Sequence, residues 1–163
     1  MFGVDDPAIE EAVRAYVKLM RASRGVTACL EHRLAARGLT GTQLGVLEAL
    51  LHKGTLTHRE LGRKVLTSAG NMTDVVDKLE ARGLVRRVRG TADRRQVRVE
   101  LTDAGRAMIQ HVFPRHAEDI ARAMSGLDGT ELRALGELLR RLGMAAAQSA
   151  AEPAALAIVE PAH

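Results

Sequence analysis

The chain has 163 residues and a net charge of +4, and its 46% apolar residues are enough for one domain or for two small lobes that share a core. With two Phe, one Tyr and no Trp, the composition favours a helical core over a β-sandwich and disfavours a stacking platform for single-stranded nucleic acid. The single cysteine, Cys29, excludes an intrachain disulfide and disfavours a zinc site built on cysteines.

Neither a membrane segment nor a secretion signal is indicated by the sequence. No apolar run approaches the roughly 20 residues that a membrane-spanning helix needs. The first residues lack the basic and apolar regions of a signal peptide. The cytoplasm is therefore the expected location, and no membrane partner is expected.

Residues 7–37 are predicted to form one long helix, because apolar side chains such as Ile9, Val13 and Met20 recur at helical spacing. At 1.5 Å per residue this helix would be about 45 Å long, which is more than a domain of this size can cover by itself. A second subunit is therefore its expected partner. Gly38 is predicted to end it as a C-terminal cap.

Three shorter helices are predicted to follow. Residues 40–43 and 57–60 have the pattern of capping boxes and open the first two. The third follows Thr67 or Ser68, and its apolar positions have the spacing i, i+3, i+4 and i+7. These positions are Met72, Val75, Val76 and Leu79. Gly83 is placed to end this helix in the left-handed conformation.

The period of the apolar residues then changes from 3.6 to 2. Val97, Val99 and Leu101 alternate with charged residues, which is typical of a half-buried strand. Residues 85–89 are its predicted partner in a hairpin, and Leu56 could add a very short strand.

Two further helices are predicted after the hairpin. Thr102 caps the first, which runs to about Ser125, and Pro114 must kink it or break it. The second starts at Asp128 and carries a stripe of leucines. The Ala-rich residues 144–163 are predicted to be frayed or disordered.

Helix, turn, helix and a two-stranded ribbon are, in this order, a winged helix-turn-helix, which places one helix in a DNA major groove and a basic loop in the adjoining minor groove. Residues 63–98 hold ten Lys/Arg and four Asp/Glu, a balance of +6 against +4 for the whole chain. A basic module on a near-neutral body indicates a DNA-binding lobe. The predicted fold class is therefore mainly α with a small β-hairpin wing.

Six stretches of the chain, in this order and spacing, match the motifs of one known family. They are LTGTQLGVL at 39–47, LGRK at 61–64, SAGNMT at 68–73, LEARGLV at 79–85, DRR at 93–95 and LTDAG at 101–105. In these stretches the chain resembles the MarR family of bacterial transcription regulators, over about residues 9–143.

The resemblance implies a homodimer built by the helices of residues 1–38 and 102–143, with the winged helix-turn-helix lobe at residues 39–101. It also implies a palindromic operator in double-stranded DNA, and often a small anionic or phenolic effector that weakens DNA binding. The expected function is a dimeric, sequence-specific transcriptional regulator, most often a repressor.

The first turn of the helix after residue 67 is expected to read base edges through short side chains. These are Ser68, Ala69, Asn71 and Thr73. The alternative is that Ser68 and Asn71 only cap the helix or bond its own backbone.

At the wing, Arg94 and Arg95 are expected to enter the minor groove, and Asp93 to brace one of them. The alternative is a solvated hairpin tip with a weak surface ion pair. Five further cations are candidates for phosphate contacts, which set position but not sequence. They are Lys64, Lys78, Arg86, Arg87 and Arg89. Because Arg86 and Arg87 point to opposite faces of the ribbon, both cannot serve equally.

A cleft between the dimer helices and the DNA-binding lobe is the expected place for an effector. Its candidate lining residues are Tyr16, Met20, His32, Leu44, Leu47 and Met108, and the alternative is that these side chains belong to the core. Cys29 is expected to be buried and inert, because the position of the reactive cysteine in the family's peroxide sensors corresponds to Tyr16. A urate ligand is disfavoured because the chain has no Trp.

Other functions are weighed against this one. Metal sensing is disfavoured because His111 and His116 lie about 140° apart around a helix, and no cofactor is expected. A winged helix that only scaffolds other proteins is disfavoured by the arginine-rich wing. The sequence holds no nucleophile–base pair and no Gly-rich phosphate loop, so an enzyme is not expected.

Overall fold

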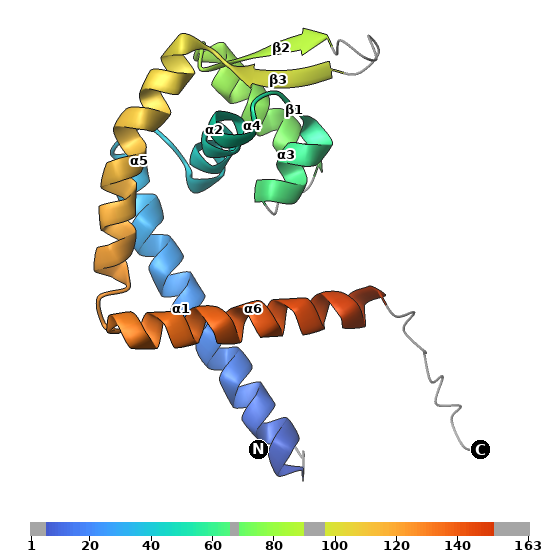
Figure 1. The fold of residues 1–163 in the computed structure, drawn as a ribbon, viewed down its shortest axis with the longest axis vertical. Coiled ribbons are helices and arrows are strands. Elements are labelled where there is room, and N and C mark those ends of the chain that lie inside the picture. The colour runs from blue at the N-terminus through green and yellow to red at the C-terminus, as the bar shows by residue number, and fades with distance from the viewer. Residues whose placement is uncertain (1–5, 66–68, 90–96, 152–163) are drawn as a thin grey trace, which may run out of the picture. The chain divides into compact units, whose positions relative to one another are not determined.

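The computed structural model describes residues 6–65, 69–89 and 97–151, and these residues form a mainly helical fold with one small sheet (Figure 1). The elements are α1 (Pro7–Ala35), α2 (Gly41–Lys53), β1 (Leu56–Thr57), α3 (His58–Val65), α4 (Ala69–Ala81), β2 (Val85–Arg89), β3 (Val97–Leu101), α5 (Asp103–Ala123) and α6 (Gly129–Ala151). The predicted fold class and the predicted order of elements are confirmed.

The chain divides into two compact units. The first ends at Met124 and contains α1 to α5 with the sheet, and the second begins at Ser125 and contains α6.

Helix α6 extends further than the sequence predicted. It opens with a reciprocal cap, in which the Asp128 amide donates to the Glu131 carboxylate at 2.8 Å and the Glu131 amide donates to Asp128 Oδ1 at 2.9 Å. It then continues to Ala151. The predicted disorder is therefore wrong for residues 144–151, because alanine is the strongest helix former and no proline interrupts this stretch. The remainder of that predicted tail lies outside the described residues.

Helix α5 runs through Pro114 without a break. It starts where predicted, with the Thr102 hydroxyl accepting from the Gly105 amide at 3.0 Å. Of the two outcomes predicted at Pro114, the break does not occur.

Two glycines end helices in the same way. Gly38 has φ +72° and follows α1, and Gly83 has φ +68° and follows α4. After each glycine the chain donates back across the last turn, from the Leu39 amide to the Leu34 carbonyl at 3.2 Å and from the Leu84 amide to the Leu79 carbonyl at 3.0 Å. All four leucines are buried, so the apolar contact that accompanies this cap is present at both ends.

Capping boxes open α2 and α3, as the sequence predicted. The Gln43 amide donates to the Thr40 hydroxyl at 3.2 Å, and the Thr40 amide donates back to Gln43 Oε1 at 3.1 Å. Thr57 and Glu60 make the same exchange, at 3.2 and 2.7 Å. The hydrogen bond from the Thr57 amide lowers the pKa of Glu60 below its usual value.

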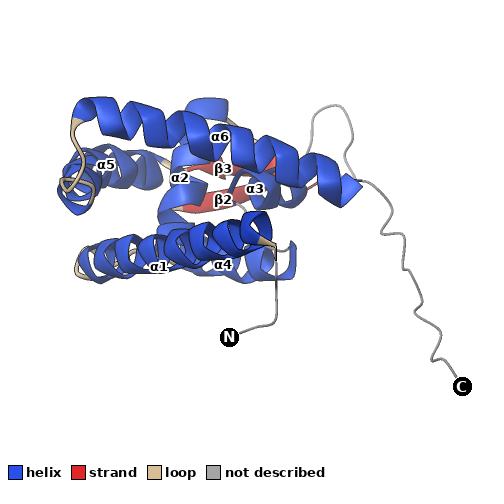
Figure 2. Ribbon diagram, turned by 90° about the horizontal axis from the view of Figure 1, so that it is seen from below, coloured by secondary structure: helices blue, strands red, loops and turns tan. Residues whose placement is uncertain are grey.

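The sheet has the strand order β1-β3-β2, with both pairings antiparallel. Figure 2 shows β2 and β3 side by side. Val99, at the centre of β3, pairs with Leu56 of β1 and with Arg87 of β2 and is fully buried. The predicted short strand at Leu56 is therefore confirmed.

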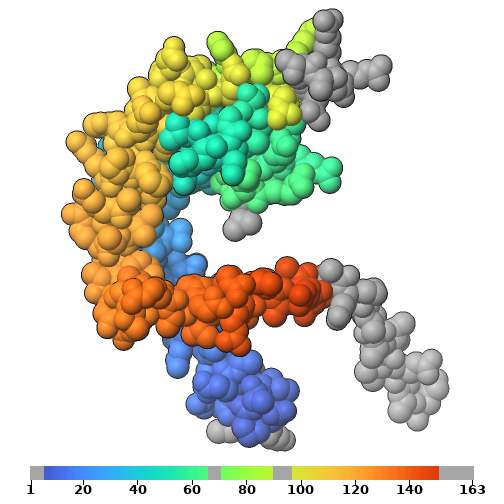
Figure 3. Space-filling model, viewed as in Figure 1, coloured from blue at the N-terminus to red at the C-terminus, as the bar shows by residue number. Residues whose placement is uncertain are grey.

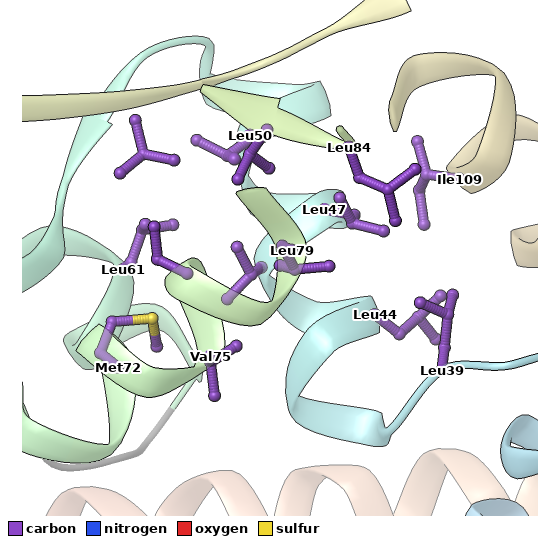
Figure 4. Packing of buried hydrophobic residues seen from close by; sticks show 14 of the residues in the cluster. Leu39, Leu44, Leu47, Leu50, Leu61, Met72, Val75, Leu79, Leu84 and Ile109 are labelled. Carbon is purple, nitrogen blue, oxygen red and sulfur yellow. The ribbon is translucent and has the colours of Figure 1, made fainter. Parts of the chain in front are cut away.

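The core lies between the sheet and the helices that precede and follow it. The buried side chains of α4 are Met72, Val75, Val76 and Leu79, which are the four that the helical spacing predicted. They join leucines of α2 and α3 and Ile109 of α5 in one apolar cluster (Figure 4). Helices α2 and α3 contact each other, and the sides of them that face away from the core lie at the surface (Figure 3, teal and green).

The N-terminal part of α1 presents apolar side chains that the described residues leave exposed. Ile9 is 50% exposed, Val13 52%, Tyr16 62% and Met20 45%. On α6, Leu138 is likewise 58% exposed. Exposed apolar stripes of this extent are typical of surfaces that bind another protein chain.

One glycine is required by a close approach of backbone. The start of α5 passes the turn after α4, and a Cβ atom on Gly105 would lie 1.9 Å from the Leu84 carbonyl oxygen. That carbonyl also accepts a hydrogen bond from the Thr102 amide at 3.1 Å, so it cannot easily move away.

Gly105→Ala is therefore expected to lower the free energy of unfolding by about 1–3 kcal/mol, the usual cost of overpacking. Gly25→Ala is the matched control, since a Cβ at Gly25 of α1 meets nothing within 4 Å. The control should be neutral or stabilising by up to about 1 kcal/mol through helix propensity. Urea unfolding of both variants checks this, and an unchanged midpoint for Gly105→Ala would contradict the packing described.

Candidate nucleic-acid interface

Helix α4 has one buried face and one polar face. Met72 and Val76 are fully buried, whereas Asn71, Thr73 and Lys78 are exposed. Asn71 and Thr73 lie in the first turns of the helix, where the sequence placed the base-reading residues. Ala69 is the first residue of α4, and Ser68, with the predicted cap, lies outside the described residues.

The ribbon of β2 and β3 forms the wing. Its register runs from Val85↔Leu101 to Arg89↔Val97, so the chain leaves and re-enters the hairpin at directly opposed residues. The predicted tip residues Asp93, Arg94 and Arg95 fall in the loop between these strands and lie outside the described residues.

Four of the five predicted phosphate-binding cations are exposed. They are Lys64 on α3, Lys78 on α4, and Arg86 and Arg89 on β2. The Arg86 side chain is 66% exposed, and its Nε donates to Glu100 of the neighbouring strand at 2.6 Å.

Arg87 differs from these four cations. Its side chain is only 29% exposed, and its guanidinium donates to the carboxylates of Asp77 and Glu80 on α4. The sequence predicted that Arg86 and Arg87 would not both contact phosphates equally. In the structure Arg86 contacts Glu100 on the neighbouring strand, whereas Arg87 contacts α4.

A second arginine joins the ribbon to the start of α3. Arg98 Nη2 on β3 donates to the Thr55 carbonyl at 2.6 Å and lies 3.8 Å from the Glu60 carboxylate. Thr55 Oγ1 in turn donates to Glu100 at 3.3 Å. This link is not predicted by the sequence, because its partners are 38 to 45 residues apart and no local pattern marks them.

A winged helix-turn-helix with a polar, cation-bearing face is thus assembled within the first unit. The MarR family model matches residues 39–97, which span α2 to the start of β3. The HTH-type transcriptional regulator MhqR of Bacillus subtilis is 34% identical over 139 residues, which cover 85% of this chain and 96% of MhqR.

The chain belongs to the MarR family. It is a DNA-binding transcriptional regulator of that family and not an enzyme.

Solved structures agree with this assignment. Bordetella bronchiseptica BpsR, whose DNA binding is regulated by 6-hydroxynicotinic acid, is 30% identical, with a TM-score of 0.72 over 80% of this chain and 98% of BpsR. A mutant of E. coli MarR complexed with operator DNA is 22% identical, with a TM-score of 0.74 over 84% of this chain and 99% of that one, which supports the fold. Among the described helices of this MarR-family chain, none has the length and hydropathy of a membrane span.

A buried carboxylate joins α1 to α5. Asp119 of α5 has no exposed surface and accepts from Arg33 of the last turn of α1 at 3.1 Å and from Arg37 of the following turn at 2.5 Å. Arg122 adds a contact of 3.0 Å from its own helix. The hydrogen bond from Arg37 holds the pKa of Asp119 below its usual value, although burial opposes this. The cluster is not predicted by the sequence, because Asp119 is 82 residues from Arg37 and 86 from Arg33.

The end of α1 also contacts α2 and α4. Arg82, just after α4, donates from Nη1 to the Gly38 carbonyl at 2.6 Å. The Gly41 amide, at the start of α2, donates to Glu31 of α1 at 2.9 Å. The turn between α1 and α2 is therefore tied to the helix that carries Asn71.

The structure does not bring the six predicted effector-binding residues together around one cavity. Leu44 and Leu47 are buried in the core, because they lie on the inward face of α2, and Met108 packs against that core. For these three the alternative of core packing holds. Tyr16 and Met20 are exposed on α1.

The structure places His32 and Cys29 on an exposed surface near the end of α1. His32 lines an open hollow of about 610 Å³ at the end of α1, together with Cys29, Arg33, Ala36 and Arg37. Cys29 is exposed, so its predicted burial is wrong within this chain. The reason is its position, about 140° around the helix from the buried Leu34.

Asp119→Asn is expected to lower the melting temperature at pH 7, because Arg33 and Arg37 lose their charged acceptor. Since the pKa of Asp119 is lowered in the folded state, its contribution is complete above the usual aspartate pKa of about 4 and is lost as pH falls through the folded value. The difference in melting temperature between wild type and variant should therefore shrink as the pH is lowered from 7 towards 2. A difference that is constant with pH would show that Asp119 does not act as a carboxylate. Glu118→Gln, on an exposed neighbour, is the control.

Proposed function

We propose that this MarR-family regulator acts as a homodimer, binds a palindromic operator and represses transcription until a small aromatic or phenolic ligand releases it. The observation that carries the dimer is the exposed apolar stripe of α1, in which Ile9, Val13, Tyr16 and Met20 are each 45 to 62% exposed. A second copy that covers this stripe removes it from water, and two identical DNA-binding lobes then require an operator with matching two-fold symmetry. Repression follows because a dimer bound to an operator excludes other proteins from that duplex.

In the proposed complex α4 enters the major groove by its N-terminal turns. Ser68, Ala69, Asn71 and Thr73 are its base-reading residues, and an asparagine amide can bond the N6 and N7 edge of adenine. The support in the structure is the orientation of the helix, whose opposite face is held in the core by Met72.

The wing lies over the adjacent minor groove in this proposal. Arg94 and Arg95 enter the groove, and Asp93 holds one of them in place. Lys64, Lys78, Arg86 and Arg89 neutralise phosphates on either side, which is supported by their exposure in the described part of the chain.

The effector is proposed to be an aromatic acid or phenol that binds at the exposed N-terminal part of α1, beside Tyr16 and Met20. His32 lines the hollow at the other end of this helix and is not part of the proposed site. The relative BpsR responds to such a compound. A thermal-shift screen with phenols, quinones, salicylate and 6-hydroxynicotinic acid tests this, and a compound that raises the melting temperature should also weaken operator binding. A screen in which stabilising compounds leave operator binding unchanged would contradict the proposed release.

The first test of the whole proposal is selection of duplexes from a random pool by the purified protein. Palindromic sequences should be enriched, and complexes should contain two chains per duplex. A monomeric protein, or one that ignores duplex DNA at low salt, would contradict the proposal and favour a protein-interaction scaffold.

Arg94→Ala combined with Arg95→Ala is expected to weaken operator binding about tenfold or more, since each minor-groove arginine contributes both charge and shape readout. The matched control is Arg106→Ala with Arg115→Ala, which removes the same charge from exposed positions of α5. Fluorescence anisotropy with the selected operator checks both. Equal losses for the two variants would mean that net charge, not the wing, sets the affinity.

Asn71→Ala is expected to relax the base preference at one or two operator positions, with a loss of about 1–3 kcal/mol on the preferred site. Binding to an operator series in which each base pair is substituted in turn measures this. If every substituted operator is weakened in equal proportion, Asn71 does not read bases and only supports the helix.

A further inference from the structure

Arg87 binds two acidic residues of another element. It lies on β2, in register with the buried Val99 of β3. Its guanidinium donates to Asp77 through Nη2 and to Glu80 through Nη1. Its backbone amide also donates to Glu80, at 3.0 Å. The backbone amide and the side chain of Arg87 are thus both hydrogen-bonded to the helix that carries the proposed base-reading residues.

The two carboxylates occupy a definite place on α4. Asp77 and Glu80 are three residues apart, so they lie on one face of the helix about one turn from each other. The rigid fork of a guanidinium fits two acceptors at such a spacing and fixes direction as well as distance. The apolar contacts of α4 do not fix the distance and direction between α4 and the ribbon in this way, because burial of apolar surface is not directional.

The carboxylates are also in an unfavourable place for a DNA-binding helix. Asp77 is 55% exposed and Glu80 36%, and both are on the helix that approaches DNA. Negative side chains near phosphates weaken binding, so on charge alone their removal should strengthen it. Their contacts with Arg87 suggest a role that outweighs this repulsion.

We propose that Arg87 is a positioning residue for DNA recognition: by holding Asp77 and Glu80 it fixes α4 against the β2–β3 ribbon and so sets the spacing between the major-groove helix and the minor-groove wing. The proposal rests on the proposed function, because it assumes that α4 and the wing bind the same duplex. It removes Arg87 from the set of phosphate-binding cations in which the sequence had placed it, and leaves Arg86 there.

His58, at the start of α3, faces the same cluster. Burial and the positive charge of Arg87 lower its pKa below the usual value, whereas Asp77 and Glu80 act in the opposite direction. Arg87, Asp77 and Glu80 together form a clamp between the ribbon and α4.

The test is the double variant Asp77→Ala with Glu80→Ala, which removes both acceptors with residues that favour helix. Affinity is measured for the operator selected by the wild type and for a non-specific duplex of equal length. Non-specific affinity should rise, because two negative charges are lost. Operator affinity should fall, so that the ratio of the two affinities drops by about tenfold or more.

Glu100→Gln is the matched control on the ribbon. Glu100 binds the exposed Arg86, so its neutralisation removes a negative charge without touching the clamp. Both affinities should rise together and leave their ratio unchanged. Adding Arg87→Ala to the double variant should lower the ratio no further, since groups that act as one unit are not additive.

Arg87→Lys guards against an effect of folding alone. It keeps the charge and removes the fork, and its helix content and melting temperature are recorded beside its affinities. A folded Arg87→Lys protein should lose specificity. If Arg87 instead neutralised a phosphate, lysine would keep that charge, and both the specificity and the salt dependence of operator binding would stay at wild-type values. The proposal is overturned if the double variant binds the operator as well as or better than the wild type with an unchanged ratio. A wild type that selects no operator would instead refute the proposed function itself.

Discussion

The apolar seam between α4 and the rest of its lobe determines which side of this helix faces outward. Met72, Val76 and Leu79 are fully buried against the neighbouring helices and the sheet. With these three fixed, the helical period leaves Asn71 and Thr73 no position except the surface. Rotation of α4 that buried these polar side chains would expose three large apolar ones, at roughly 1.5–3 kcal/mol each. The polar face offered to DNA is thus a consequence of core packing.

Ion pairs and charged hydrogen bonds fix the relative directions of elements that the apolar contacts hold together. Arg87 joins the ribbon to α4, Arg98 joins it to the start of α3, and Asp119 joins α1 to α5. Exposed ion pairs contribute little to stability, so we interpret the first two as setting direction more than holding the fold. Asp119 is different, because it is buried and its charge is matched by Arg33 and Arg37. Arg82 also donates a hydrogen bond to the Gly38 carbonyl. Together these contacts give a physical route by which a displacement at the end of α1 would be transmitted to α4.

Most of the fold could be predicted from the sequence, because its signals are local. Gly38 and Gly83 end helices where their conformational freedom is needed, and the change of apolar period at Val97 marks the ribbon. The end of α6 lies beyond the predicted one, because the alanines of residues 144–151 continue the helix. Pairings between distant residues, such as Asp119 with Arg37, 82 residues away, leave no local pattern. Of the site, the exposed positions of α4 follow from its period, whereas the engagement of Arg87 depends on how the ribbon folds back onto α4.

The central claim is that two copies of this chain each place α4 in the major groove of one duplex. Methylation interference on the selected operator tests it most directly, because dimethyl sulfate modifies guanine N7 in the major groove and adenine N3 in the minor groove. We expect N7 methylation to block binding in two sets of positions about one helical turn, or a multiple of it, apart, with N3 effects confined to the flanking wing contacts. Binding that tolerates N7 methylation throughout, or is blocked at one set of positions only, would contradict the account.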